Sequence, residues 1–161
     1  MRRLLFTFLA MFALVVSINA SDDCIMVKEL NVKFKNGSTK FVDQKKELDK
    51  IREFKNFIQK TDLYAVIEGH TNNLSNAVYN YNLSQKRAVK VMNILRKMGL
   101  AKSHVAAMGF GETTPLYDNK TKEGLEKNRR VVAEVFNSAK EMKAYIAKQK
   151  ERIKNIKFIE Q

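Results

Sequence analysis

The sequence predicts a two-layer α/β or α+β sandwich in which helices pack on a sheet. Three observations predict this class. Short apolar runs, typical of strands, recur between longer segments. The longer segments carry apolar residues at spacings of three and four, as amphipathic helices do. No internal repeat interrupts this order, and 161 residues suit one domain with appendages.

The first 20 residues have the layout of a secretory signal peptide. A basic start, Met1-Arg2-Arg3, precedes the uncharged run Leu4–Ile18, and the small residue Ala20 stands at the expected cleavage edge. A retained membrane anchor is the alternative, but this run of about 15 residues is shorter than the roughly 20 that span a bilayer. We therefore expect a signal peptide over residues 1–20, a domain over residues 21–137 and a basic amphipathic helix over residues 138–161.

Cys24 is the only cysteine of the chain, which excludes an internal disulfide. Two acids, Asp22 and Asp23, stand directly before it and argue against lipid attachment at this position. A free thiol and an intermolecular bridge both stay open for Cys24.

The first half of the domain predicts a strand, a helix and a second strand. Leu30, Val32 and Phe34 alternate at period two, which is typical of a half-buried strand. Residues 42–60 form the helix, which Asp43 helps to start. Its apolar stripe consists of Leu48, Ile51, Phe54 and Ile58. The run 63–69 is mostly apolar and predicts a buried strand.

The second half predicts another helix, two strands and a final helix. We expect a helix over residues 75–98, with Ser84 as the N-cap of its main segment and Gly99 at its end. Strands follow over residues 105–110 and 129–136, joined by a polar loop over residues 111–127. From Ser138 the chain is expected to be helical, with apolar side chains along one face: Met142, Tyr145, Ile146, Ile153 and Ile156.

Charge and motifs limit the function classes. The net charge is +13, and removal of two arginines with the signal peptide leaves 13 − 2 = +11. Such a charge would attract anionic polymers or lipid headgroups, but for most of the lysines we expect only a soluble, self-repelling surface. The expected export argues against nucleic acid as a partner. His70 and His104 have no ligand cluster at suitable spacing, so we expect no metal, no cofactor and a structural His70. The sequence shows no arrangement of a nucleophile with a general base, so we do not expect an enzyme.

An ordered set of motifs runs through the domain: Gly69-His70-Thr71-Asn72, Tyr79-Asn80, Leu83-Ser84, Arg87-Ala88, Gly109-Phe110-Gly111-Glu112, Pro115 and Asn128-Arg129-Arg130-Val131. In this order the motifs resemble the OmpA-like C-terminal domain family, which associates with peptidoglycan. The resemblance covers about residues 32–136. It implies an α+β domain, a two-layer sandwich of βαβαββ type, here with an added C-terminal helix, and no catalytic activity.

The resemblance also implies a ligand and a site. Family members hold the diaminopimelate residue of the peptidoglycan stem peptide between an arginine, here Arg87, and an aspartate, whose position is Asn72 in this chain. Arg87 would bind the carboxylate of diaminopimelate, and Thr71, Asn80 and Arg130 would complete the site. Asn72 carries no charge, so it should hold the ligand's ammonium less strongly, by about one order of magnitude in affinity.

Two interpretations of function stay open. In the first, the mature protein lies in the periplasm, associated with the outer membrane or the cell wall, and binds peptidoglycan non-covalently. In the second, the loss of the acid at Asn72 marks a structural or assembly component of an envelope or motor complex. The segment 138–161 would fold back on the domain, pair with another subunit or an envelope protein, or lie peripherally on a membrane surface.

Overall fold

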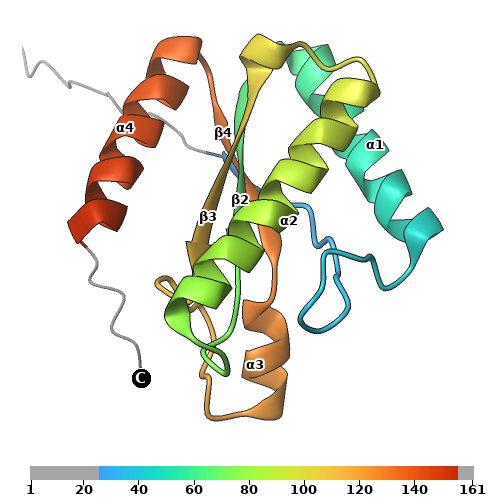
Figure 1. Ribbon diagram of the computed structural model, residues 1–161. Helices are drawn as coiled ribbons and strands as arrows, with labels where there is room; N and C mark the ends of the chain where they lie inside the picture. The colour runs from blue at the N-terminus through green and yellow to red at the C-terminus, as the bar shows by residue number, and fades with distance from the viewer. Residues whose placement is uncertain (1–25, 156–161) are drawn as a thin grey trace, which may run out of the picture.

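The computed structural model describes residues 26–155, and side chains from residue 30 to residue 154. The expected signal peptide and Cys24 therefore lie outside the described residues, as does Ile156. Figure 1 shows helices on both sides of a central sheet. The elements are β1 (Met26–Glu29), α1 (Gln44–Thr61), β2 (Tyr64–His70), α2 (Ala77–Lys97), η1 (Lys102–His104), β3 (Val105–Gly111), α3 (Lys122–Asn128), β4 (Val131–Phe136) and α4 (Ala139–Asn155).

The strands form one mixed sheet in the order β1-β4-β2-β3. Strands β2 and β3 are parallel, so the chain crosses between them through α2, whereas β4 is antiparallel to both β2 and β1. Helices α1 and α2 cover one face, and α4 covers the other (Figure 1). This arrangement confirms the predicted α+β class and the added C-terminal helix.

The apolar residues of β2 alternate between two buried clusters. Ala65 and Ile67 face α1 and α2, where they meet Phe54 of α1. Val66 faces α4, where it belongs to a second cluster with Met142. Because both faces of the strand are covered, its sequence is mostly apolar rather than alternating.

Helix α4 folds back on its own domain. Met142 is buried against the sheet, and Tyr145, Ile146 and Ile153 pack around it. The apolar face predicted for this helix is therefore covered by the chain's own sheet as far as Ile153. None of the helices within residues 26–155 combines the length and the hydropathy that a bilayer-spanning segment needs.

The first predicted strand is wrong in its extent. Leu30, Val32 and Phe34 are buried as the alternation predicted, but β1 ends at Glu29. Asn31 has a positive φ of 47°, which a continuing strand does not allow. The chain after it leaves the sheet, and Phe34 forms only an isolated bridge with Phe41.

The start of α2 also differs from the prediction. Asn76 is the N-cap, since its Oδ1 accepts hydrogen bonds from the backbone amides of Val78 and Tyr79. Ser84 lies inside the helix, fully buried, and its Oγ accepts a hydrogen bond from the Gly111 amide over 2.9 Å. The predicted helix end at Gly99 (φ 96°) and the Asp43 cap of α1 are confirmed.

Helix α2 approaches the sheet closely through glycines of β2 and β3. A Cβ atom at Gly69 or Gly109 would collide with the backbone of α2 at Ser84 and Gln85. The Gly109 amide donates to Oε1 of Gln85 over 2.5 Å. These contacts fix α2 on the sheet, and with it the residues that α2 carries toward the site.

The predicted loop over residues 111–127 is wrong over its last six residues, which belong to the short helix α3 (Lys122–Asn128). Thr121 caps it, and its Oγ1 accepts a hydrogen bond from the Gly124 amide. A helix of seven residues spans only two turns, too short for a periodic apolar stripe to reveal it. This helix forms one wall of the cavity described below.

Candidate ligand-binding site

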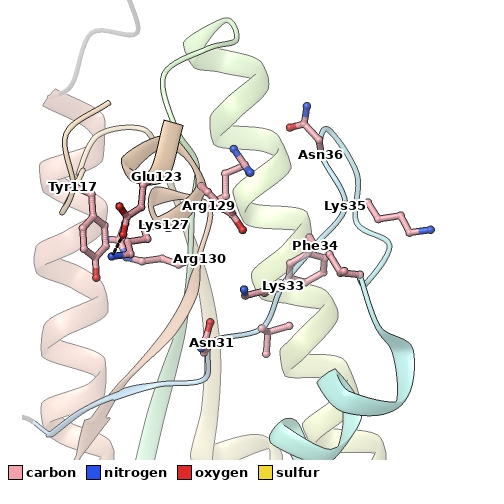
Figure 2. A pocket seen from close by; sticks show the side chains of 13 residues that line it. Asn31, Lys33, Phe34, Lys35, Asn36, Tyr117, Glu123, Lys127, Arg129 and Arg130 are labelled. Atoms are coloured by element: carbon pink, nitrogen blue, oxygen red, sulfur yellow. Dashed lines mark ion pairs between the residues drawn. The ribbon is translucent and has the colours of Figure 1, made fainter. Parts of the chain in front are cut away.

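A cavity of about 620 Å³ opens between α3 and the segment that follows β1. Figure 2 shows side chains from both walls around it. One wall consists of Asn31, Val32, Lys33, Phe34, Lys35, Asn36 and Val42, and the other of Tyr117, Glu123, Glu126, Lys127, Arg129 and Arg130. Five of these residues are lysine or arginine and two are glutamate. The cavity therefore offers cationic groups for an anion, together with carboxylates on α3.

Arg87 lies behind the first wall. Its Nε donates a hydrogen bond to the Ser38 carbonyl over 3.0 Å, and its Nη2 donates to the Lys35 carbonyl over 3.1 Å. The guanidinium carbon lies 5.1 Å from the ring centroid of Phe34, a cation–π contact. Arg87 thus fixes the segment 35–38, which supplies part of the cavity wall.

The charge of Arg87 is buried without a carboxylate beside it. The side chain is only 2% exposed, and no acid of the described residues forms an ion pair with it. Burial, and secondly the nearby charge of Arg129, lower the pKa of Arg87 from 12.5 to about 10. The guanidinium stays cationic at neutral pH, and a buried charge without a counter-ion is costly. An anion in the neighbouring cavity would offset that cost.

The turn after β2 is fixed by hydrogen bonds to α3 and β3. Asn72 is buried, its Nδ2 donates to the Leu125 carbonyl over 3.2 Å, and its Oδ1 accepts from the Leu74 amide over 3.4 Å. The amide of Thr71 donates to the Gly111 carbonyl over 2.8 Å. The amide of Asn72 therefore connects the turn to α3.

Asn80 connects the same turn to α2. Its Nδ2 donates to the Asn72 carbonyl over 3.0 Å and to Oε2 of Glu112 over 2.6 Å. The residue is 3% exposed, so its amide is occupied inside the domain. The structure thus brings Asn72, Thr71 and Asn80 together as parts of one buried junction.

Arg130 lines the cavity, although most of its side chain is buried. Its Nη2 donates to the Thr114 carbonyl over 3.0 Å and its Nη1 to the Asn128 carbonyl over 3.4 Å. Its neighbour Arg129 is more exposed and donates from Nη1 to the Leu125 carbonyl over 3.1 Å. Both arginines of the Asn-Arg-Arg motif thus stand at the cavity.

Several lining residues were missed as candidates. Arg129 is one of them, although the Asn-Arg-Arg motif around it is a signal that could have identified it. Lys35 and Asn36 belong to a turn, and the sequence of this turn does not indicate that Arg87 binds its backbone carbonyls. Glu126 lies on α3, which sequence periodicity does not reveal.

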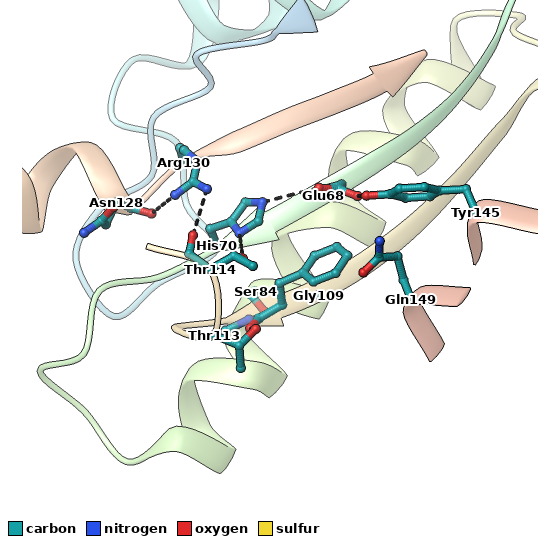
Figure 3. A network of polar contacts seen from close by, with 12 residues as sticks. Glu68, His70, Ser84, Gly109, Thr113, Thr114, Asn128, Arg130, Tyr145 and Gln149 are labelled. Atoms are coloured by element: carbon teal, nitrogen blue, oxygen red, sulfur yellow. Dashed lines mark hydrogen bonds and ion pairs between the residues drawn. The ribbon is translucent and has the colours of Figure 1, made fainter. Parts of the chain in front are cut away.

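A second polar group lies on the α4 side of the sheet (Figure 3). There Tyr145 donates to Oε1 of Glu68 over 2.5 Å, and Nε2 of His70 lies 3.6 Å from Oε2 of the same glutamate. His70 is buried, which lowers its pKa, and its Nδ1 lies 3.0 Å from Oγ1 of Thr114. Over residues 26–155, no group of three or more His, Cys, Asp or Glu side chains could hold a metal ion.

Comparisons with known proteins agree with this fold. The chain is 45% identical over 69 residues to outer membrane porin F of Pseudomonas fluorescens, covering 43% of this chain and 21% of that protein. It is 40% identical over 70 residues to peptidoglycan-binding protein ArfA of Mycobacterium tuberculosis, covering 44% of this chain and 22% of that protein. The match thus spans about a fifth of the length of either relative.

Among solved structures, the cell wall anchor of the T6SS from Pseudomonas aeruginosa has a TM-score of 0.60 and 26% identity, covering 71% of this chain and 81% of that one. The model of the OmpA family matches residues 33–129, more than half of the chain. This range includes ten of the thirteen residues that line the cavity. The chain therefore belongs to the OmpA family.

Proposed function

We propose that this chain is a non-catalytic domain that binds peptidoglycan in the bacterial cell envelope. The cavity would hold the diaminopimelate residue of the stem peptide. The observation that carries the proposal is the buried guanidinium of Arg87, which has no acid beside it among residues 30–154 and has Arg129 nearby. A carboxylate of the ligand would supply the missing counter-charge.

The chemistry of diaminopimelate suits both signs of charge in the cavity. Its free end carries one carboxylate and one ammonium. A guanidinium can bind a carboxylate through two parallel hydrogen bonds, and Arg129 and Arg130 both line the cavity. Arg87 would act from behind the wall, through its charge and by holding the segment 35–38 in place.

The relatives support this proposal and a location in the envelope. ArfA is named a peptidoglycan-binding protein, and the T6SS structure is titled a cell wall anchor. Porin F is named an outer membrane protein. Together with the expected signal peptide, these names favour the periplasm, in association with the outer membrane or the cell wall.

Co-sedimentation with purified sacculi tests the proposal. The wild-type protein should pellet with sacculi, and Arg129→Ala should weaken pelleting without loss of the far-ultraviolet circular dichroism spectrum. Arg87→Ala should abolish pelleting, and Arg87→Lys, which keeps the charge in a similar place, should retain part of it. Failure of the wild-type protein to pellet would contradict the proposal.

A structural or assembly role is the second candidate, favoured by one observation. Residue 72 is neutral, and its amide is already engaged by the Leu125 carbonyl. If the protein has lost peptidoglycan binding for this reason, it should form a defined oligomer or complex in the absence of sacculi. Light scattering of the full chain would measure the mass of that oligomer. The protein would then not pellet in the sacculus assay.

A further inference from the structure

The carboxylates that line the cavity both come from α3. Glu123 and Glu126 both line the cavity from this helix, opposite the segment that holds Lys33 and Lys35. Residues three apart on a helix lie on neighbouring positions of one face. We infer that Glu126 supplies the counter-charge for the ammonium of the bound ligand, an inference that rests on the proposed function.

Asn72 is unsuited to that task in this chain. It has no charge, it is 6% exposed, and its Nδ2 donates to the Leu125 carbonyl. An ionised carboxylate at this position could not donate that hydrogen bond. Asn72 therefore acts as a positioning residue: it holds α3, the helix that carries Glu126, against the turn after β2.

The Leu125 carbonyl joins three parts of the site. It accepts a hydrogen bond from Nδ2 of Asn72 and a second one, over 3.1 Å, from Nη1 of Arg129. Glu126 is the next residue along the chain, and its own carbonyl accepts from the Arg129 amide over 3.2 Å. An acid and a guanidinium are thus presented from one short stretch, as a zwitterionic amino-acid end requires.

Glu123 is the weaker candidate of the two glutamates. Its Oε1 lies 2.6 Å from Nζ of Lys127, and this hydrogen bond is the main reason that its pKa is lowered. Lys127 already neutralises it. Glu126 is exposed and forms no ion pair with any cation in the described part of the chain, so its carboxylate is available to a ligand.

Titration calorimetry with two matched ligands tests the inference. The first ligand is a disaccharide tripeptide that ends in meso-diaminopimelate. The second is the same compound with the free side-chain amine of diaminopimelate acetylated. The variant Glu126→Gln removes the charge with little change in shape, and Glu123→Gln is the matched control on the same helix.

We expect Glu126→Gln to bind the free-amine ligand about threefold to tenfold more weakly than the wild-type protein does. Its affinity for the acetylated ligand should equal that of the wild-type protein. Glu123→Gln should lose less than Glu126→Gln on the free-amine ligand.

The negative outcomes separate the two proposals. A wild-type protein that binds neither ligand overturns the proposed function and this inference with it. If the wild-type protein binds the free-amine ligand while Glu126→Gln binds it equally well, or loses the same factor on both ligands, only the inference is overturned.

Discussion

The hydroxyl of Tyr145 on α4 donates a 2.5 Å hydrogen bond to Oε1 of the buried Glu68 on β2. This bond crosses the interface between the C-terminal helix and the sheet (Figure 3). Burial and the hydrogen bond to Glu68 raise the pKa of Tyr145, so the hydroxyl keeps its proton at neutral pH. The contact fastens α4 to the sheet through a buried carboxyl group beside the apolar cluster under this helix.

Removal of that hydroxyl should weaken the whole domain. Tyr145→Phe is expected to lower the free energy of unfolding by about 1–3 kcal/mol, because the Glu68 carboxylate loses a buried hydrogen bond. Urea unfolding followed by circular dichroism measures this change. Tyr79→Phe is the control, since its hydroxyl bonds the exposed Gly37 carbonyl and should cost under about 1 kcal/mol. Equal losses in both variants would contradict the expectation.

Glu134 should make stability fall with rising pH. Burial, and secondly the charge of Glu68, raise its pKa from 4.5 to about 6 in the folded protein. The folded state therefore holds this proton more tightly than the unfolded state. The contribution of Glu134 is most favourable below pH 4.5 and declines as pH rises to about 6.

Glu134→Gln should remove that decline and raise stability at neutral pH. Partial solvent exposure keeps the gain to about 1 kcal/mol. Thermal unfolding between pH 4 and pH 8 checks it, with Glu53→Gln on the exposed side of α1 as the control. If the stability of Glu134→Gln changes with pH in parallel with that of the wild-type protein, this prediction is wrong.

The variant Asn72→Asp should change the stability of the domain and its affinity for the ligand in different ways. The stability reports the hydrogen bond that residue 72 donates, and the affinity reports the added charge. Loss of the donor to the Leu125 carbonyl should cost about 1 kcal/mol of stability. Because Glu126 already supplies a carboxylate in our proposal, the affinity for the free-amine ligand should rise by less than about threefold in the wild-type background. The gain should be larger in the Glu126→Gln background.

Urea unfolding and calorimetry measure the two effects of Asn72→Asp. Asn36→Asp is the control, since it adds the same charge at an exposed position in the cavity wall formed by the segment after β1. A tenfold gain with Asn72→Asp in the wild-type background would mean that the charge is missing, as the sequence alone suggested.

Gly109→Ala should disrupt the contact between α2 and the sheet. The new Cβ would collide with the backbone of Gln85, which cannot move without shifting the helix. We expect a loss of about 3 kcal/mol or more, with reduced sacculus binding because α2 carries Arg87. Gly99→Ala is the comparison: its site is open, and only its positive φ resists substitution. A fully stable Gly109→Ala protein would contradict the packing described here.

The sequence predicted the fold well where periodicity was long. Helices α1, α2 and α4 carry apolar stripes, and β2, β3 and β4 are apolar runs between turns. The predicted extent of the first strand is wrong because a single residue, Asn31, has a positive φ and turns the chain out of the sheet. The alternating apolar pattern does not reveal such a residue. The sequence also missed α3, which is too short to show a period.

The candidate site was predicted only in part. The motifs singled out residues of the turn after β2 and Arg130 of the Asn-Arg-Arg stretch, but not its neighbour Arg129, which also lines the cavity. They did not reveal that Arg87 bonds carbonyls 49 and 52 residues away. Nor did they reveal that Asn72 bonds α3 across 53 residues. Contacts between such distant segments depend on tertiary packing, so one sequence without the fold cannot supply them.

A crystal structure of the protein with a tripeptide ending in meso-diaminopimelate tests the central claim most directly. We expect density for the free end of diaminopimelate in the cavity, with its carboxylate within hydrogen-bond distance of Arg129 or Arg130 and close to Arg87. A cavity that stays empty at saturating peptide, or a peptide bound only on another face, would contradict the account.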